Sequence, residues 1–370
     1  MSNVRKQLLG IGEAAPWFRA PAVGGASAYA FDTVGGRTVL LLFFGSAADP
    51  AARAALAKIV KQRALFDDDQ ACFFGISVDP EDVAKGRIRQ ALPGLRFFLD
   101  DRRTISGLFG AAAEDGSYRP HWLLLDHALR VTGRFALGDG DAALAAAAAS
   151  VLAPPAQDWA PVISVPNVLE PELCRRLIDL YEADGGEESG FMRDVDGRTK
   201  LILDPSHKVR RDYLVEDPEL AQGLNLRLMH RLLPMVHRAF SFRATRVERL
   251  LVGCYEAETG GHFRAHRDNT TKGTAHRRFA VTINLNAEDY DGGDLNFPEF
   301  GERTYRAPTG GAIVFSCSLL HRALPVTRGR RFAFLPFLYD DAGAELRERN
   351  AGFLEGEAAN YRAANDVKVG

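Results

Sequence analysis

The sequence predicts two domains of different class, an α/β layer in residues 1–151 and a mainly β barrel or sandwich with preceding helices in residues 161–370. Three observations lead to this prediction. The chain has 370 residues, which suggests two or three domains at roughly 150 residues each. Apolar strand-like runs alternate with helical segments in the first half. Short β-like runs separated by Gly, Asn, Asp and Pro fill most of the second half.

The first half contains two continuous apolar runs, 39–44 and 72–78, as expected of strands that are covered on both faces. A helical segment is expected after each of them, at 50–64 and at 80–90. Further strands are expected at 95–99, 121–125 and 129–135.

A proline-rich stretch marks the expected boundary between the halves. The Ala-rich segment 142–149 predicts a helix, and Pro154, Pro155 and Pro161 follow it. Because proline ends helices, we place a linker at 152–160. The expected divisions are an N-terminal domain at 8–151, a C-terminal domain at 161–345 and a C-terminal tail at 346–370.

The second half begins with helices. Apolar side chains at Leu173, Leu177 and Ile178 have the spacing of an amphipathic helix over 170–183, and 217–240 predicts one or two more. The expected strands are 247–255, 262–267, 278–286, 293–297, 303–306, 311–316, 320–324 and 331–338.

The composition is that of a globular protein without a strongly charged partner. The chain has 46 Lys and Arg, 48 Asp and Glu, and 46% hydrophobic residues. Disorder across the whole chain is therefore excluded, and neither nucleic acid nor a membrane is expected as a partner. The four cysteines are too few for a disulfide scaffold. MSNVRKQLLG lacks the apolar core of a signal peptide, so a cytoplasmic protein is expected.

A metal-ligand pattern stands at His266 and Asp268. Residues i and i+2 of an extended segment point to the same side, so an imidazole and a carboxylate can reach one cation together. An isolated pair of this kind is usually on the surface. A third ligand must come from elsewhere, and His321 is the candidate. Two His and one carboxylate leave three metal positions open, which suits non-haem Fe(II) oxygenases.

An arginine follows the third candidate ligand. Arg331 lies ten residues after His321 and leads into an apolar strand. A guanidinium at the start of such a strand can hold a dicarboxylate through two parallel hydrogen bonds. Arg328 and Arg330 compete for this role. The spacing favours Arg331, and Arg330 stays open as the alternative.

With these motifs in place, residues 161–340 resemble the Fe(II)/2-oxoglutarate-dependent dioxygenases, in the prolyl 4-hydroxylase-like branch. The matching pieces are Cys254-Tyr255, the HRD at 266–268, VTINLN at 281–286, YDGGDL at 290–295, PTGGA at 308–312, and His321 followed by PVTRGRR. The order and spacing agree over roughly half of the chain.

The resemblance implies a double-stranded β-helix (jelly roll) flanked by N-terminal helices. It implies that His266, Asp268 and His321 bind Fe(II), that Arg331 binds 2-oxoglutarate, and that Tyr255 and Asn284 lie beside this co-substrate. The implied reaction uses O2 to hydroxylate an unactivated C–H bond and releases succinate and CO2, with ascorbate as a reductant. Substrates of the branch include amino acids, peptidyl residues and small metabolites. Desaturation or cyclisation stays open, whereas the carboxylate of Asp268 disfavours halogenation.

Other polar residues have weaker assignments. His262 is expected to have a rim or a structural role, and His276 is expected in a solvated loop. Segment 187–213 is polar and lies where such oxygenases carry substrate-binding loops. The candidates for substrate contacts there are Arg193, Asp194, Lys208, Arg210 and Asp212.

Residues 8–151 resemble the peroxiredoxins, which have a thioredoxin fold. The resemblance rests on APWFRAP at 15–21, LLFF at 41–44, GISVD at 75–79 and FFLD at 97–100. Peroxiredoxins carry a nucleophilic Cys immediately before a Pro at the first turn of a helix. Here Asp49 precedes Pro50, and a carboxylate cannot perform thiolate chemistry. Asp49 suits a helix N-cap instead, and Cys72 is a poor substitute for the missing thiol.

We therefore expect a non-catalytic N-terminal half that packs on the oxygenase, binds a partner or helps to dimerise. Two alternatives to the oxygenase stay open. One is a non-catalytic binding or regulatory protein built from two enzyme folds. The other is a thiol peroxidase-type redox protein, which Asp49 disfavours.

Overall fold

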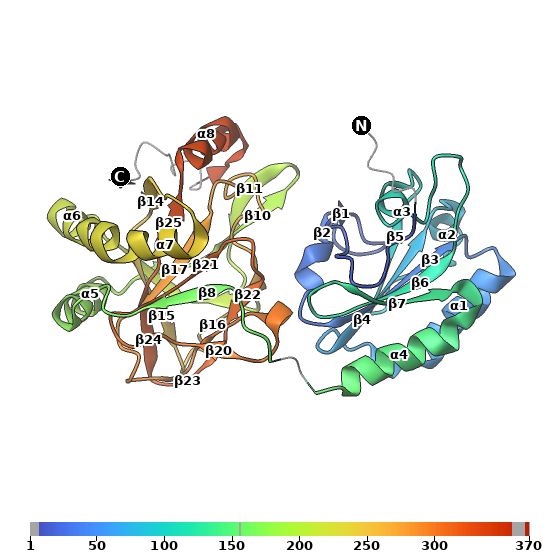
Figure 1. Cartoon of the computed structure of the whole chain (residues 1–370), viewed down its shortest axis with the longest axis horizontal. Coiled ribbons are helices and arrows are strands. Elements are labelled where there is room, and N and C mark those ends of the chain that lie inside the picture. Colours follow the sequence, from blue (N-terminus) through green and yellow to red (C-terminus); the bar gives the residue numbers. More distant parts are fainter. Residues whose placement is uncertain (1–6, 155–156, 357–366, 370) are drawn as a thin grey trace. The chain divides into compact units, whose positions relative to one another are not determined.

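The computed structural model describes residues 7–154, 157–356 and 367–369, and the chain divides into two compact units (Figure 1). The first comprises Met1–Asp158 and Pro298–Glu302, and the second comprises Trp159–Phe297 and Arg303–Gly370. Residues 155–156 of the expected linker, 357–366 and 370 of the expected tail, and 1–6 of the N-terminal stretch lie outside the described residues.

The first unit is built on one five-stranded sheet. Its strands are β3 Thr38–Gly45, β4 Ala71–Ser77, β5 Leu95–Leu99, β6 His121–Leu125 and β7 Val131–Ala136. Their order is β5-β4-β3-β6-β7. β3 runs parallel to β4 and antiparallel to β6, and β4 runs parallel to β5. A separate pair, β1 Arg19–Ala20 with β2 Tyr29–Ala30, lies in the N-terminal stretch.

Both faces of this sheet are buried, which explains the continuous apolar run of β3. Leu40 and Leu42 pack with the helices α1 (Pro50–Lys61) and α4 (Gly140–Leu152). Leu41 and Phe43 pack on the other face, with Phe31 and with α3 (Thr104–Leu108). Neighbouring residues of a strand point to opposite faces, so each face requires its own apolar set.

The helix expected at 80–90 is much shorter, because only α2 (Glu81–Ala84) forms. Gly86 adopts a positive φ of 62°, which stops a right-handed helix. The carboxylate of Asp82 is buried and accepts hydrogen bonds from the Ala47 N–H and the Ser77 hydroxyl. The segment is therefore tied to β4 instead of continuing as a helix.

The second unit contains two larger sheets and two strand pairs (Figure 1). The ten-stranded sheet consists of β8 Val162–Val165, β9 Glu187–Glu188, β13 Arg211–Leu214, β14 Arg246–Glu248, β15 Leu251–Glu256, β17 Phe279–Asn284, β21 Ala312–Ser316, β24 Arg330–Phe334, β25 Phe337–Tyr339 and β26 Val367–Lys368. The five-stranded sheet has the order β12-β16-β22-β19-β20, with bounds Lys208–Val209, His262–His266, His321–Ala323, Leu295–Asn296 and Thr304–Tyr305. The pairs are β10 Phe191–Val195 with β11 Arg198–Ile202, and β18 Asp291–Gly292 with β23 Val326–Arg328.

Helices cover one face of the ten-stranded sheet. They are α5 Pro171–Asp184, α6 Pro218–Arg227 and α7 Leu233–Phe240, with a π-helical turn at Leu228–Leu232. A further helix, α8, spans Asp341–Asn350, and Arg347 on it donates to the Tyr339 hydroxyl at 3.3 Å. Val252 and Cys254 of β15 pack into this apolar layer. Tyr255 instead packs with Ala323 and Phe263 of the five-stranded sheet. The face of the larger sheet that carries Tyr255 is called the site face below.

Two strands expected as single runs are each divided in the structure. The run 247–255 breaks between β14 and β15, where Arg249 has a positive φ of 45°. The run 331–338 breaks between β24 and β25 at Leu335 and Pro336, and proline cannot donate a ladder hydrogen bond. Both breaks let one run pair with different neighbours, since β14 pairs with β25 and β15 pairs with β24.

Segment 187–213, expected as a polar loop, contains five short strands from β9 to β13. Asp196 and Gly197 form the turn between β10 and β11, with φ values of 51° and 78°. An Asp-Gly pair between alternating residues is a strong hairpin signal, and it was present in the sequence. No helix in the described part of the chain is long and apolar enough to cross a membrane.

Candidate metal centre

The three predicted ligands come together where two neighbouring strands meet. His266 ends β16, Asp268 follows two residues later, and His321 opens β22. β16 and β22 pair antiparallel with His266 opposite His321, and the two ring centroids are 4.3 Å apart. One ligand atom from each of the three residues lies within 4.8 Å of the other two.

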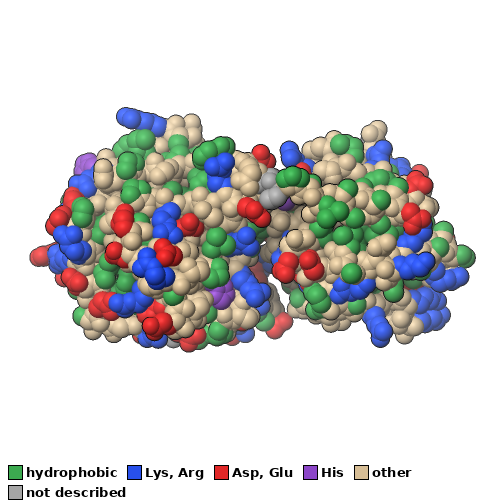
Figure 2. Space-filling model, turned by 90° about the horizontal axis from the view of Figure 1, so that it is seen from below, with side chains coloured by type: hydrophobic (Ala, Val, Ile, Leu, Met, Phe, Trp, Pro, Cys, Tyr) green, Lys and Arg blue, Asp and Glu red, His purple; other side chains and the backbone are tan. Residues whose placement is uncertain are grey.

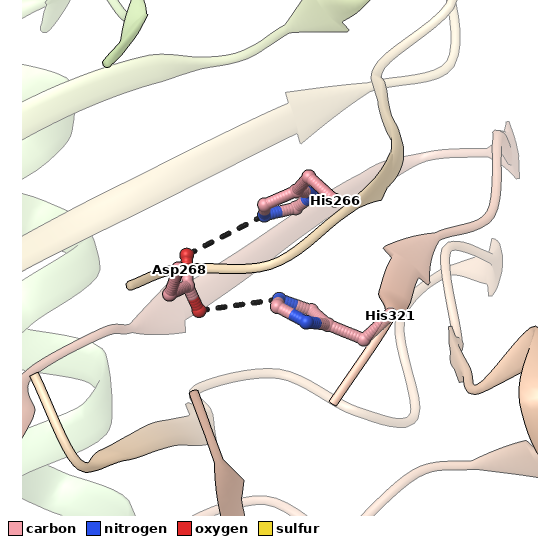
Figure 3. A group of neighbouring side chains, drawn as sticks. All are labelled: His266, Asp268 and His321. Carbon is pink, nitrogen blue, oxygen red and sulfur yellow. Dashed lines mark ion pairs between the residues drawn. The ribbon is translucent and has the colours of Figure 1, made fainter. Parts of the chain in front are cut away.

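Both imidazoles present the same nitrogen to the carboxylate (Figure 3). His266 Nε2 lies 3.5 Å from Asp268 Oδ1, and His321 Nε2 lies 3.3 Å from Oδ2. The Nδ1 atoms point away and contact backbone carbonyls, His266 with Arg264 O at 2.7 Å and His321 with Leu319 O at 3.0 Å. A proton on each Nδ1 satisfies these carbonyls and leaves Nε2 as a free lone pair. The tautomers therefore suit metal binding.

The protonation states agree with this arrangement. Burial, followed by the neighbouring His321, lowers the pKa of His266 to about 4, so its ring is neutral at pH 7. Burial alone would raise the pKa of Asp268, but His321 and His266 outweigh it and hold that pKa well below its usual value. A metal ligand must be a neutral imidazole or an ionised carboxylate, and His266 and Asp268 meet these conditions.

Backbone contacts position Asp268 against the segment that precedes His321. The Asp268 N–H donates to Cys317 O at 3.0 Å, and Asn269 Nδ2 donates to Ser318 Oγ at 2.8 Å. Arg267 donates to the Ser318 carbonyl. These contacts join the loop after β16 to the turn before β22.

The loop after Asp268 is anchored by a buried carboxylate that the sequence analysis did not identify. Glu248 contacts His276 Nε2 at 2.9 Å and accepts from Arg277 Nε at 2.9 Å and Nη2 at 2.6 Å. The expectation that His276 is solvated is wrong, because its side chain is 1% exposed. Its partner lies on another strand, β14, and local polarity cannot reveal such a contact.

Arg331 lies on the site face, opposite Tyr255. The two residues pair across β24 and β15, and the Arg331 guanidinium lies 5.1 Å from the centre of the Tyr255 ring. Arg331 is 2% exposed, yet its Nε and Nη1 have no hydrogen-bond partner. Tyr290 is buried beside it, and burial raises the pKa of Tyr290 against the opposing charge of Arg331.

The unpartnered donors of Arg331 favour it over Arg330 as the arginine that binds a carboxylate. Arg330 is half exposed and paired with Glu182, so its charge already has a carboxylate partner at the protein surface. Buried polar groups are rarely left without partners, and two free guanidinium donors fit a carboxylate. Asn284, on β17, also has a buried Oδ1 without a partner, while its Nδ2 donates to Ala307 O at 2.6 Å.

Of the candidates in segment 187–213, three form a buried charged cluster. Arg210 Nε and Nη2 donate to the two oxygens of Asp212, each at 2.6 Å, and Arg210 Nη1 donates to the Tyr255 hydroxyl at 3.3 Å. Lys208 Nζ lies 4.9 Å from the centre of the Phe263 ring. Burial, then the charge of Arg210, lowers the pKa of Lys208 well below its usual value.

The remaining candidates lie elsewhere. Arg193 is exposed above the Phe191 ring, and Asp194 accepts from Thr199 Oγ1. His262 is half buried, its Nδ1 contacts Gly260 O at 2.7 Å, and it is not among the clustered ligands.

Comparison with known families agrees with this division of the chain. The model of the 2OG-Fe(II) oxygenase superfamily matches residues 250–339, which include all three ligands and Arg331. The model of the AhpC/TSA family matches residues 11–133, in the first unit. Both resemblances seen in the sequence are thereby confirmed.

Individual relatives give a more specific match for the part of the chain that matches the 2OG-Fe(II) oxygenase superfamily. A PKHD-type hydroxylase of Synechococcus sp. is 39% identical over 93 residues, 24% of this chain and 41% of its own length. A PKHD-type hydroxylase of Cupriavidus metallidurans is 30% identical over 187 residues, 46% of this chain and 75% of its own length. Through its C-terminal half, the chain belongs to the PKHD-type hydroxylases. It spans less than half the length of the Synechococcus relative.

Solved structures also match each half. A prolyl-4-hydroxylase of Pseudomonas putida is 17% identical, with a TM-score of 0.38, over 48% of this chain and 92% of its own. Mycobacterium tuberculosis AhpC is 18% identical, with a TM-score of 0.30, over 35% of this chain and 83% of its own.

Proposed function

We propose that the protein is an Fe(II)- and 2-oxoglutarate-dependent dioxygenase that hydroxylates an unactivated C–H bond of an amino acid, a peptidyl residue or a small metabolite. The observation that carries this proposal is the convergence of His266, Asp268 and His321, together with the buried guanidinium of Arg331, whose Nε and Nη1 have no hydrogen-bond partner. The two facing sheets would form the double-stranded β-helix of this class, and the reaction would take place in the cytoplasm.

The residues fit both implied groups. Two neutral imidazoles and one carboxylate suit Fe(II) and leave positions for further ligands. The free Nε and Nη1 of Arg331 suit the distal carboxylate of 2-oxoglutarate. When bound, Fe(II) with 2-oxoglutarate supplies the oxidation of a C–H bond by O2, coupled to release of succinate and CO2. The carbonyls of Arg264 and Leu319 keep the ring protons on Nδ1, so the Nε2 atoms stay available.

Other side chains orient the co-substrate and exclude water. Tyr255 lies between the guanidiniums of Arg331 and Arg210, 5.1 and 5.7 Å from its ring centre, which restrains the ring. Tyr255, Tyr290, Ala323 and Val326 form a small buried apolar cluster. Apolar side chains that exclude water lower the local dielectric constant and so strengthen the electrostatic attraction between Arg331 and a carboxylate.

The test is 2-oxoglutarate-dependent succinate release with Fe(II), ascorbate and O2. His266→Ala is expected to lower this rate at least about a hundredfold, since losing even an outer partner of a metal ligand costs 10- to 100-fold. His262→Ala is the matched control, because His262 lies on the same strand outside the clustered ligands. Equal rates in wild type and His266→Ala would remove the enzymatic proposal in favour of a binding or regulatory role.

For the first unit we propose a non-catalytic role in binding a protein partner or a second copy of the chain. The position expected for a nucleophilic thiol holds Asp49, whose carboxylate accepts from the Ala51 N–H at 2.7 Å as the N-cap of α1. The size-exclusion mass of the full chain, compared with the mass of one chain, tests self-association.

A further inference from the structure

The guanidinium of Arg210 lies beside Tyr255, and each of its nitrogens has an acceptor within the chain. Nε and Nη2 donate to the two oxygens of Asp212, each at 2.6 Å. Nη2 also donates to Ser189 Oγ at 3.2 Å, and Nη1 donates to the Tyr255 hydroxyl at 3.3 Å. Arg210 is therefore engaged within the chain, whereas Nε and Nη1 of Arg331 have no partner.

The ion pair of Arg210 and Asp212 is shielded from solvent, with side chains 5% and 19% exposed. Charged side chains of both signs are interspersed on the face of the second unit visible in Figure 2, where water and salt weaken ion pairs. Burial alone would raise the pKa of Asp212, but the charges of Arg210 and Lys208 outweigh it and lower this pKa to about 2. The carboxylate is thus ionised at pH 7 and holds the guanidinium through two parallel hydrogen bonds.

A glycine makes room for this guanidinium. Gly253 lies on β15, opposite Asp212 of β13. A Cβ atom at Gly253 would lie 3.0 Å from Arg210 Cδ, 3.1 Å from Arg210 Nε and 3.0 Å from Leu335 Cδ1, so these groups would have to move by a few tenths of an ångström. Residues i and i+2 of a strand share a face. The missing side chain at Gly253 therefore lets Arg210 lie across β15 and reach Tyr255 on the same face.

The bond between Arg210 and Tyr255 determines what the Tyr255 hydroxyl can do. A guanidinium has N–H donors and no acceptor, so the phenol oxygen is the acceptor in this bond. In the described part of the chain it is the one hydrogen bond of this hydroxyl, although Tyr255 is 4% exposed. Buried polar groups are rarely left without partners. The O–H proton of Tyr255 is therefore available to a ligand.

Tyr255 and Arg331 face the same space. They are directly opposite each other in β15 and β24, and such a pair lies on one face of a sheet. The Arg331 guanidinium lies 5.1 Å from the centre of the Tyr255 ring. Arg331 offers two buried donors without a partner, and Tyr255 offers its O–H. Donors of this kind suit an ionised carboxylate, which only accepts hydrogen bonds.

We propose that Arg210, held by Asp212, is a positioning residue for 2-oxoglutarate. It orients the Tyr255 hydroxyl so that the phenol proton is donated to a carboxylate oxygen of this co-substrate. The inference rests on the proposed function and adds two residues to it. Arg210 and Asp212, which the sequence predicts as substrate contacts, are thereby reassigned to co-substrate binding, and both act through Tyr255.

The test measures the Kd of 2-oxoglutarate by calorimetry, with the full chain and saturating Mn(II). Tyr255→Phe should raise this Kd about tenfold or more, since it removes one hydrogen bond to a charged group. Arg210→Met should raise the Kd by a similar factor. In a chain that already carries Tyr255→Phe, Arg210→Met should change the Kd less than about twofold, because both substitutions remove the same interaction. The Kd of Mn(II) should stay the same in all of these variants, since neither residue is among the clustered ligands.

Arg211→Met is the matched control, because this adjacent arginine is exposed and donates to the carbonyls of Gly185 and Gly186 instead. It should bind 2-oxoglutarate as wild type does. Arg210→Lys separates positioning from stability. It keeps a positive charge beside Asp212 but lacks the fork that also reaches the phenol, so the free energy of unfolding should recover while the Kd of 2-oxoglutarate stays raised.

If Arg210→Met does not fold, Gly253→Ala displaces the same guanidinium and should raise the Kd by a smaller factor. An unchanged Kd in Arg210→Met, or an equal effect of Arg210→Met with and without Tyr255→Phe, would overturn the inference. A Kd that recovers together with stability in Arg210→Lys would also overturn it. If the proposed function itself fails, wild type with Mn(II) does not bind 2-oxoglutarate at all, and the inference falls with it.

Discussion

The two units of this chain each resemble an enzyme family, but they differ in which buried side-chain atoms lack a hydrogen-bond partner. In the first unit, Asp49 caps α1, and the buried side-chain atoms without a partner among the described residues are two imidazole nitrogens, on His121 and His127. In the second unit, the unpartnered buried atoms include guanidinium donors of Arg331 and Arg249. An unpartnered buried neutral nitrogen costs a fold about 1–3 kcal/mol, and an unpartnered buried charge costs more.

This difference supports the proposal that the second unit binds anionic ligands, because an anion would supply the partner that the buried Nε and Nη1 of Arg331 lack among the described residues. In the first unit, the position expected to hold a reactive thiol is occupied by Asp49, which caps the N-terminus of α1. The following predictions test this contrast, beginning with the largest expected effect.

The largest effect on stability is expected from the carboxylate that anchors the Asp268 loop. Glu248→Ala leaves Arg277 and His276 buried without their partner, and breaking a buried pair costs about 3–5 kcal/mol. Chemical denaturation of the second unit measures this loss. Glu182→Ala removes an exposed pair with Arg330 and should cost less than about 1 kcal/mol. Similar losses in both variants would contradict a special role for the buried cluster.

The first unit should show a pH-dependent stability that comes from His121. Burial lowers the pKa of this imidazole to about 4 from its usual 6.5. Between these values the unfolded chain binds the extra proton and the folded chain does not. The contribution is therefore complete above pH 6.5 and is lost as the pH falls to about 4, by about 3 kcal/mol at most.

His121→Phe should remove this contribution while keeping a ring stacked on Phe43, whose centroid is 5.0 Å away. The measurement is the free energy of unfolding of the first unit at several pH values in both proteins. The difference between wild type and variant should change between pH 6.5 and 4. A constant difference would mean that His121 has the same pKa in the folded and the unfolded chain, so that burial does not shift it.

In the second unit, Arg331→Met should raise the KM and the Kd for 2-oxoglutarate roughly a hundredfold, because it removes two charge-assisted hydrogen bonds. Arg330→Met is the adjacent control, with an exposed side chain paired to Glu182, and should change these values less than about twofold. Calorimetric binding of 2-oxoglutarate in the presence of Mn(II) gives the Kd without turnover. A larger effect at Arg330 would reverse the assignment.

No effect is expected from Cys72, the one cysteine in the sequence of the first unit. Burial raises the pKa of Cys72 to about 12, so the nucleophilic thiolate is absent at pH 7. Hydroperoxide consumption by the full chain should stay at the background rate in wild type and in Cys72→Ser. Turnover that disappears in Cys72→Ser would show that the first unit has kept a redox activity.

Much of the fold could be predicted because its signals are local. Five strands of the first unit lie within one or two residues of the expected apolar runs. The shortened α2 and the divided runs around Arg249 and Pro336 were not predicted, because partner strands decide where these segments end. The hairpin at Asp196-Gly197 could have been predicted from its turn residues.

The sequence by itself predicted His266, Asp268 and His321 as a ligand set, since an i, i+2 pair and an ordered series of motifs follow from spacing along the chain, and the structure brings these three side chains together. It also determined that Asp49 replaces a reactive thiol. Only the tertiary structure decided that Arg331 is buried and Arg330 is paired outside, that Glu248 holds His276, and that Lys208 lies against Phe263. These are contacts between distant segments, and strand pairing and burial create them without any local signature.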